Sequence, residues 1–125
     1  MQIHSLTTTA LAGVFLLAAT VPSATAEPKP VTVRGYVIDS ACAFTKNLEK
    51  PISADCAKAC AKAGSPLVIL ADNGSVYWPT SDAMPAIGQN EKLLPFAAQK
   101  VVVSGKLYER GGSKALLIEK IEAAK

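Results

Sequence analysis

Short runs of β-branched and apolar residues, each ended by a turn signal, constrain the fold of this 125-residue chain most strongly. Residues 31–39 (VTVRGYVID) alternate apolar with polar or aromatic side chains, which is typical of a strand. Residues 66–71 (PLVILA) and 75–78 (SVYW) flank an Asp-Asn-Gly sequence, a strong signal for a tight hairpin turn. The first part of the chain therefore predicts three strands, with Gly35 at a bend or bulge in the first.

Two further strands are predicted near the C-terminus. Residues 101–108 (VVVSGKLY) and 115–121 (ALLIEKI) are joined by a glycine-containing turn. A terminal helix is the alternative for the last segment, because Leu, Glu, Lys and Ala are good helix formers, but the preceding turn favours a strand. Residues 79–99 hold three prolines and a short apolar cluster, which predicts a loop followed by a brief helix or turn that plugs one end of the core.

Residues 40–64 interrupt this β pattern with a segment rich in Ala, Cys and Lys. Within it, residues 53–63 (SADCAKACAKA) predict a helix that has Ser53 as its N-cap and Asp55 in its first turn. Gly64 is a natural C-terminal stop for this helix. We therefore expect a helical insertion that carries two of the three cysteines.

The expected order of elements is typical of a small five-stranded OB-like barrel, a mainly β fold that here includes a helical insertion. Closing the sheet would hide strand edges that otherwise pair between molecules. Residues 31–125 are predicted to form a single domain, preceded by a flexible proline-rich leader at residues 27–30.

Residues 1–26 have the pattern of a cleaved secretory signal peptide. Residues 10–21 (ALAGVFLLAATV) are apolar, and the small residues Ala24, Thr25 and Ala26 follow them. A membrane-spanning helix needs about 20 apolar residues, so this segment is too short for a retained anchor. We expect a periplasmic or secreted protein with no stable membrane insertion after cleavage.

Cleavage would also remove His4, the single histidine of the chain. Mechanisms that need imidazole within one chain, such as a Ser-His-Asp triad or a His-ligated zinc site, are then excluded. The 13 basic and 10 acidic residues give a formal charge of +3 and form no basic block. No nucleic-acid partner is expected, and the predicted partner is an unknown exported protein or a small ligand.

Cys42, Cys56 and Cys60 are the residues with the most distinctive chemistry. In an oxidising compartment, nearby cysteines are expected to form a disulfide. Cys56 and Cys60 lie on one helical face, but side chains at that spacing do not point at each other, which favours a bond from Cys42 to one of the pair. Closing a loop of roughly 15 residues would stabilise the domain by about 3 kcal/mol.

Two alternatives remain for the cysteines. The three thiolates could bind one soft metal ion, Cu(I) or Zn(II), and Asp39 or Asp55 could then supply a fourth ligand to zinc. The third cysteine could instead be a redox-active thiol, although the Cys-x-x-x-Cys spacing differs from that of thioredoxin-like enzymes.

Aromatic residues in the predicted strands are candidates for a ligand-stacking face. An OB-like barrel can stack sugars or bases on such side chains, whereas aromatic residues in strands more often pack against the core. The candidates are Tyr36, Tyr77, Trp78 and Tyr108.

Several segments of the chain resemble a loose family of small, mostly uncharacterised exported bacterial proteins. The similarity covers residues 31–121 and rests on the order of residues 35–42 (GYVIDSAC), 55–60 (DCAKAC), 63–66 (AGSP) and 101–105 (VVVSG). It implies the OB-like fold and export, without a particular activity. Many members of that family carry a histidine soon after the first cysteine; residues 44–46 (FTK) replace it here, which weighs against a metal site.

The sequence thus supports three hypotheses. The first is a non-enzymatic exported binding or accessory module stabilised by a disulfide and lacking a cofactor. The second is a periplasmic protein that binds Cu(I) or Zn(II) through Cys42, Cys56 and Cys60. The third is a thiol-disulfide redox protein that acts through the unpaired cysteine.

Overall fold

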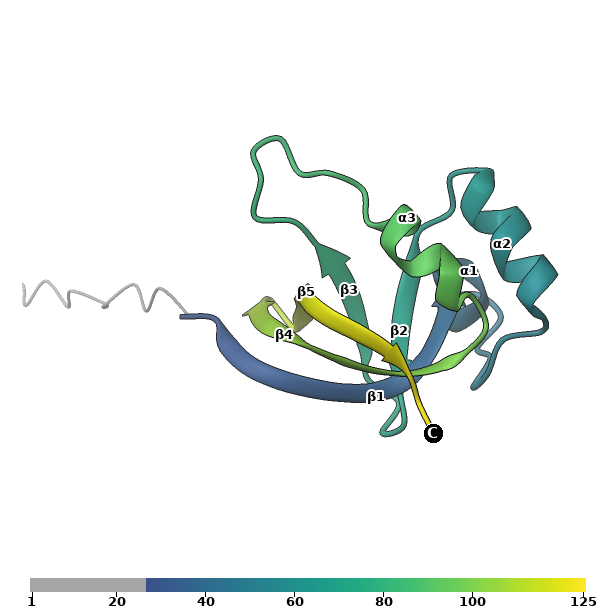
Figure 1. The fold of residues 1–125 in the computed structure, drawn as a ribbon, viewed down its shortest axis with the longest axis horizontal. Helices are drawn as coiled ribbons and strands as arrows, with labels where there is room; N and C mark the ends of the chain where they lie inside the picture. Colours follow the sequence, from purple (N-terminus) through teal and green to yellow (C-terminus); the bar gives the residue numbers. More distant parts are fainter. Residues whose placement is uncertain (1–26) are drawn as a thin grey trace, which may run out of the picture.

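Five strands form a closed barrel in a computed structural model that describes residues 27–125 (Figure 1). Around the barrel the strands follow the order β1, β2, β3, β5, β4; β3 and β5 are parallel and the other neighbours antiparallel. The predicted mainly β, five-stranded OB-like fold is thereby confirmed, whereas the predicted signal peptide lies outside the described residues. The strands are β1 (Lys29–Asp39), β2 (Leu67–Ala71), β3 (Val76–Thr80), β4 (Lys100–Arg110) and β5 (Ser113–Ala123).

Most strand boundaries extend slightly beyond the predicted ones. β1 begins at Lys29, so Lys29 and Pro30 of the predicted flexible leader pair with β4 instead. The C-terminal segment is strand β5, so the alternative of a terminal helix is wrong. Pairing with β4 along almost all of its length outweighs the helix propensity of that segment.

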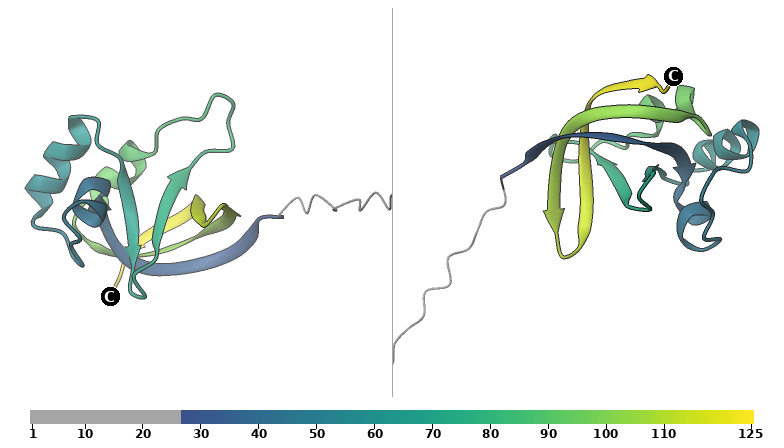
Figure 2. Two further views of the ribbon diagram at one scale, coloured as in Figure 1. Left: turned by 180° about the vertical axis from the view of Figure 1, so that it is seen from behind. Right: turned by 90° about the horizontal axis from the view of Figure 1, so that it is seen from below.

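The short helices all lie in the two long connections between strands. α1 (Ser40–Phe44) and α2 (Ala54–Lys62) form the insertion between β1 and β2, and Figures 1 and 2 show both at one side of the barrel. α3 (Asn90–Leu93) and the 3₁₀ turn η1 (Leu94–Phe96) precede β4, as the apolar cluster there predicted. α1 was not predicted, since five residues are too few to show a helical periodicity.

The barrel closes where two glycines allow the strands to approach. A Cβ atom on Gly35 would run into the carbonyl oxygen of Leu70 on β2. A Cβ atom on Gly105 would run into the carbonyl oxygen of Leu117 on β5, beside a register shift between Ser104 and Gly105. These glycines therefore allow close packing of neighbouring strands, and at Gly35 the structure shows this close approach without a register shift.

Side chains that alternate along the strands fill the interior of the barrel. Leu93 of α3 is fully buried and packs with them, so the short helix plugs the core as predicted. Burial of these apolar groups is the main stabilising contribution in a domain of this size. The buried cluster comprises Val33, Val37, Ala61, Leu67, Ile69, Ala71, Leu93, Val101, Val103, Leu116 and Ile118.

The insertion covers part of the outer surface of the sheet. Ile38 and Val68 are paired across β1 and β2, point away from the interior cluster, and are nevertheless almost fully buried. Both α1 and α2 pack on β1, α1 also packs on β2, and Ala57 of α2 is buried. The cysteine-bearing insertion is therefore docked on the barrel.

Candidate functional site

The insertion brings the three cysteines to one place. Cys42 lies on α1 directly after β1, while Cys56 and Cys60 lie one turn apart on α2. The predicted N-cap of α2 is confirmed, because the Ser53 hydroxyl accepts a hydrogen bond from the Cys56 amide at 3.1 Å. All three thiols are half-buried. The predicted helix that carries Cys56 and Cys60 is therefore present, and Cys42 lies on a short helix that was not predicted.

No disulfide joins these cysteines, in contrast to the bond expected from Cys42 to the helical pair. Cys56 and Cys60 are 4.4 Å apart. A disulfide requires its sulfur atoms about 2 Å apart, and the separate helices bring Cys42 near the pair without that contact. The structure therefore presents three free thiols.

Asp39 is the buried polar residue of the site. It is the last residue of β1 and the N-cap of α1, where its Oδ1 accepts hydrogen bonds from the amides of Ala41 at 2.9 Å and Cys42 at 3.2 Å. Its side chain is almost fully enclosed, with the residue 2 % exposed, and Oδ2 has no hydrogen-bond partner. Such an atom is costly to bury, and the Cys42 thiol is the neighbouring polar group that interacts with this carboxylate.

The thiols and this carboxylate influence one another electrostatically. Burial raises the pKa of the Cys42 thiol, and the negative charge of Asp39 and then the neighbouring Cys56 and Cys60 raise it further. The pKa of Cys60 is raised by burial, by Asp39 and by Cys56 in the same way. Cys42 and Cys60 are thus protonated at neutral pH, whereas thiol-disulfide catalysts depend on a lowered cysteine pKa.

We call Asp39, Cys42, Cys56 and Cys60 the thiol centre. Within residues 27–125, no three His, Cys, Asp or Glu side chains are arranged closely enough to hold a metal ion as they stand. The thiols of this centre would have to converge further to share one. Of the two carboxylates predicted as further ligands, Asp39 lies at the thiol centre, while Asp55 is an exposed residue in the first turn of α2.

The predicted aromatic face is only partly formed. Tyr77 is half-buried and packs against the core, which favours a packing role over the predicted ligand-stacking role for this residue. Trp78 of β3 and Tyr108 of β4 both pair with Ala115 of β5, which places them on the outer surface. Tyr36 points outward from β1, opposite Leu70.

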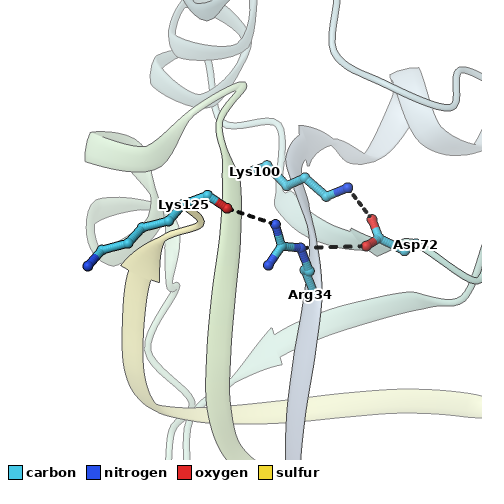
Figure 3. A network of polar contacts seen from close by, with 4 residues as sticks. All are labelled: Arg34, Asp72, Lys100 and Lys125. Atoms are coloured by element: carbon cyan, nitrogen blue, oxygen red, sulfur yellow. Dashed lines mark hydrogen bonds and ion pairs between the residues drawn. The ribbon is translucent and has the colours of Figure 1, made fainter.

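Two of the outward aromatic rings, those of Trp78 and Tyr36, have partners within the protein. Phe44 of α1 stacks on Trp78, with ring centroids 5.7 Å apart and the planes inclined by 15°. The Lys100 ammonium lies 5.6 Å from the centroid of the Tyr36 ring. Asp72 in the β2–β3 turn holds Lys100 at 2.9 Å, beside Arg34, which also donates to the carbonyl of Lys125 (Figure 3). The rings of Tyr36 and Trp78 are therefore partly engaged within the protein, whereas Tyr108 is an exposed aromatic residue.

Two shallow hollows flank the Phe44–Trp78 stack. The first, of about 650 Å³, lies between the insertion and the β2–β3 hairpin, with Tyr36, Phe44 and Leu48 in its lining. The second, of about 600 Å³, lies beside Trp78, with Pro66 and Ile87 in its lining. Phe44 lines the first hollow and Trp78 lines the second.

Two features of the candidate site are not predicted from the sequence. No local pattern indicates that Phe44 meets Trp78, because the two residues are distant in the chain. The sequence offers Asp39 as a metal ligand or as one of a carboxylate pair with Asp55, and not as a helix cap, although an Asp directly before a helix is a recognised N-cap signal.

Comparison with protein-family models, curated proteins and solved structures finds no match. The resemblance to small exported bacterial proteins therefore stays a prediction. None of the helices in the described part of the chain is long and apolar enough to cross a membrane.

Proposed function

We propose that this protein is an exported, non-enzymatic binding module that takes up one soft metal ion, Cu(I) or Zn(II), at the thiol centre. The observation that carries this proposal is that three free thiols belong to one insertion beside the buried Asp39 carboxylate, although they would have to converge further to share one ion. Thiolates are preferred ligands of both ions. A bound ion would satisfy the sulfur atoms and compensate the buried negative charge.

The four side chains suit the two ions in different ways. Cu(I) accepts three sulfur ligands, which Cys42, Cys56 and Cys60 supply. Zn(II) in a closed site prefers four ligands in a tetrahedron, and Asp39 Oδ2 is available as the fourth. Each thiol must lose its proton on binding, so affinity rises with pH.

A thiol-disulfide redox function is the second candidate. The 4.4 Å separation of Cys56 and Cys60 favours it, because a small rearrangement would let an oxidant remove two electrons and two protons and leave a disulfide. This bond differs from the stabilising disulfide that the sequence predicted, which joins Cys42 to one of the two cysteines of α2. The raised pKa of Cys60 counts against rapid exchange, because the thiolate is the attacking species.

Metal titration of the purified, reduced protein under anaerobic conditions tests the proposal. Bathocuproine disulfonate competes for Cu(I), and 4-(2-pyridylazo)resorcinol competes for Zn(II). We expect one ion per chain and a loss of affinity of at least tenfold in each of the Cys42→Ser, Cys56→Ser and Cys60→Ser variants.

Asp39→Asn and Asp55→Asn form a matched pair of carboxylate variants. Asp39→Asn should weaken Zn(II) more than Cu(I), whereas Asp55→Asn should change neither, because Asp55 is exposed. Sub-stoichiometric binding of both ions, or binding that survives removal of the cysteines, would refute the metal site. Recovery of one disulfide and one free thiol from native protein would favour the redox alternative.

A further inference from the structure

Two exposed aromatic residues stand on the outer surface of the strands that close the barrel. Trp78 of β3 and Tyr108 of β4 both pair with Ala115 of β5, so the three residues form one row across three neighbouring strands. Trp78 and Tyr108 are each 37 % exposed. We call Trp78, Ala115 and Tyr108 the aromatic row. The small side chain of Ala115 separates the two large aromatic side chains of this row.

The strand register fixes the distance between the two aromatic residues. One strand separates Trp78 from Tyr108, so their Cα atoms lie two strand spacings, about 10 Å, apart. In an extended β-1,4-linked glycan, successive sugars are turned over, so alternate sugars present the same face to a surface. Two sugar units of such a chain span about the same distance as two strand spacings. The aromatic row is therefore spaced to stack on alternate sugars of one glycan chain.

A second outward row places hydrogen-bonding groups beside the rings. Thr80 follows Trp78 by two residues on β3 and pairs with Leu117 of β5. Leu117 pairs in turn with Lys106, two residues before Tyr108 on β4. Residues two apart on a strand share a face, so the Thr80 hydroxyl and the Lys106 ammonium belong to the face that carries the rings. Both groups suit sugar hydroxyls, which donate and accept hydrogen bonds.

The aromatic row adjoins a hollow at its β3 end. Trp78 and Thr80 both line the hollow of about 600 Å³, and Gln89 and Glu91 belong to the same lining. An amide and a carboxylate are further hydrogen-bonding groups for sugar hydroxyls. A glycan chain on the aromatic row could therefore continue from the rings onto a polar surface.

The indole of Trp78 is held in place by a neighbouring ring. Phe44 of α1 stacks on it with the ring centroids 5.7 Å apart and the planes inclined by 15°. This contact occupies one face of the indole, and Trp78 nevertheless remains partly exposed. A side chain that is ordered before binding loses less conformational entropy when a ligand stacks on it.

The charges near the aromatic row distinguish a glycan from a nucleic acid. A single-stranded nucleic acid needs a positively charged groove along its phosphates, in addition to aromatic rings. The Lys106 ammonium lies 3.7 Å from the carboxylate of Glu119, which offsets its charge. Arg110, two residues after Tyr108 on β4, adds one cation, which does not make such a groove. The surroundings of the rings therefore favour an uncharged ligand.

The same surroundings differ from the core of a protein interface. Such a core is a continuous apolar patch from which charged residues are depleted. Here the rings are set apart by Ala115, and Thr80, Lys106 and Glu119 lie close by. Separate rings among polar side chains are better suited to sugars, which have apolar faces and polar edges.

We propose that the aromatic row binds a neutral β-1,4-linked glycan, with the rings of Trp78 and Tyr108 stacked on alternate sugars. The side chains of Thr80 and Lys106 donate hydrogen bonds to sugar hydroxyls beside them. The row shares no residue with the thiol centre. The inference is therefore independent of the proposed metal binding.

Isothermal titration calorimetry with cellohexaose and chitohexaose tests this site, and maltohexaose, a curved α-1,4-linked glycan, is the control ligand. We expect at least one of the two β-linked hexasaccharides to bind and maltohexaose to bind more weakly. A disaccharide reaches one ring, whereas a tetrasaccharide reaches both. Affinity should therefore rise from the disaccharide to the tetrasaccharide of the same series.

Four variants test the residues of the aromatic row. Trp78→Ala and Tyr108→Ala should each weaken hexasaccharide binding by about tenfold, the scale of one lost stacking contact. Tyr108→Ala should also abolish the gain from disaccharide to tetrasaccharide, whereas Tyr108→Phe keeps the ring and should bind as the wild type. Ala115→Leu keeps both rings, fills the space between them and should weaken binding. Circular dichroism verifies that each variant is folded.

Ile52→Ala is the control for loss of an exposed apolar side chain, since Ile52 lies on the insertion and is 70 % exposed. This variant should bind the hexasaccharide as the wild type does. Failure of both β-linked hexasaccharides to bind at millimolar concentration overturns the inference. Wild-type affinity in a folded Tyr108→Ala variant overturns the two-ring site, and tighter binding of single-stranded oligothymidylate than of either glycan overturns the ligand class.

Discussion

Asp39 uses its two carboxylate oxygens differently. Oδ1 completes the first turn of α1, and Oδ2 is buried beside the thiols without a partner. Capping a helix needs one oxygen and would be served equally well by a Ser or an Asn. In addition to capping α1, the negative charge of Asp39 raises the pKa of the Cys42 and Cys60 thiols.

Asp39→Asn should make the neighbouring thiols more reactive. The charge of Asp39 is the second largest cause, after burial, of the raised pKa of both Cys42 and Cys60. Its removal should lower both pKa values toward the ordinary range and speed alkylation by iodoacetamide at pH 8, with each cysteine followed by mass spectrometry. Asp55→Asn is the matched control, and equal labelling rates in the two variants would contradict the assigned role of Asp39.

The raised pKa of Cys42 also predicts a loss of stability at alkaline pH. The folded protein favours the protonated thiol, so the stabilising contribution is fully present below the unfolded-state pKa, near 9.0, and is lost as pH rises through the folded-state value. Cys42→Ser removes this titration. Urea unfolding from pH 7 to 10 should show the free energy of unfolding of the wild type falling more steeply above pH 9 than that of the variant. Parallel pH profiles would be inconsistent with a perturbed thiol.

At the level of elements, helices and hairpins form where several local sequence signals, such as caps and turn residues, occur together. α2 has an N-cap, an acidic first turn, a basic last turn and Gly64 at φ +102° beyond its end, and it forms where these signals predicted. The β2–β3 hairpin forms around Asp-Asn-Gly in the same way. α1 has only its Asp39 cap and is held by packing on β1 and β2.

Ser53→Ala should destabilise the protein by about 1 kcal/mol, because the Cys56 amide loses its capping acceptor. Thermal or urea unfolding measures this change. Ser53→Asp is the matched rescue variant, since Asp is an equally good cap and its charge suits a helix N-terminus. A destabilised Ser53→Asp would indicate that the hydroxyl acts other than as a cap.

For the whole molecule, closure of the barrel creates two separate apolar regions, one inside the barrel and one on the outer face of β1 and β2. The interior is filled by the strands and by Leu93, and the outer face of β1 and β2 is covered by the insertion. The thiol centre lies with that insertion. The barrel therefore acts as a rigid support, and the insertion carries the chemistry.

Leu93→Ala should destabilise the molecule by about 2–5 kcal/mol, because it opens a cavity at the plugged end of a closed core. Met84→Ala is the control: Met84 is 95 % exposed, so its truncation should change the free energy of unfolding by less than about 0.5 kcal/mol. Urea unfolding of both variants checks the pair. A small loss in Leu93→Ala would mean that α3 does not plug the barrel.

The sequence by itself determined the five strands, the helix α2 and the mainly β architecture, because alternation, turn residues and caps act over a few neighbouring residues. Only the tertiary structure decided that Tyr77 faces inward, that Phe44 meets Trp78, and that Asp39 lies among free thiols instead of beside a disulfide. These contacts join residues far apart in the chain, or side chains on separate helices. They are set by how the barrel closes and where the insertion docks, which no local pattern encodes.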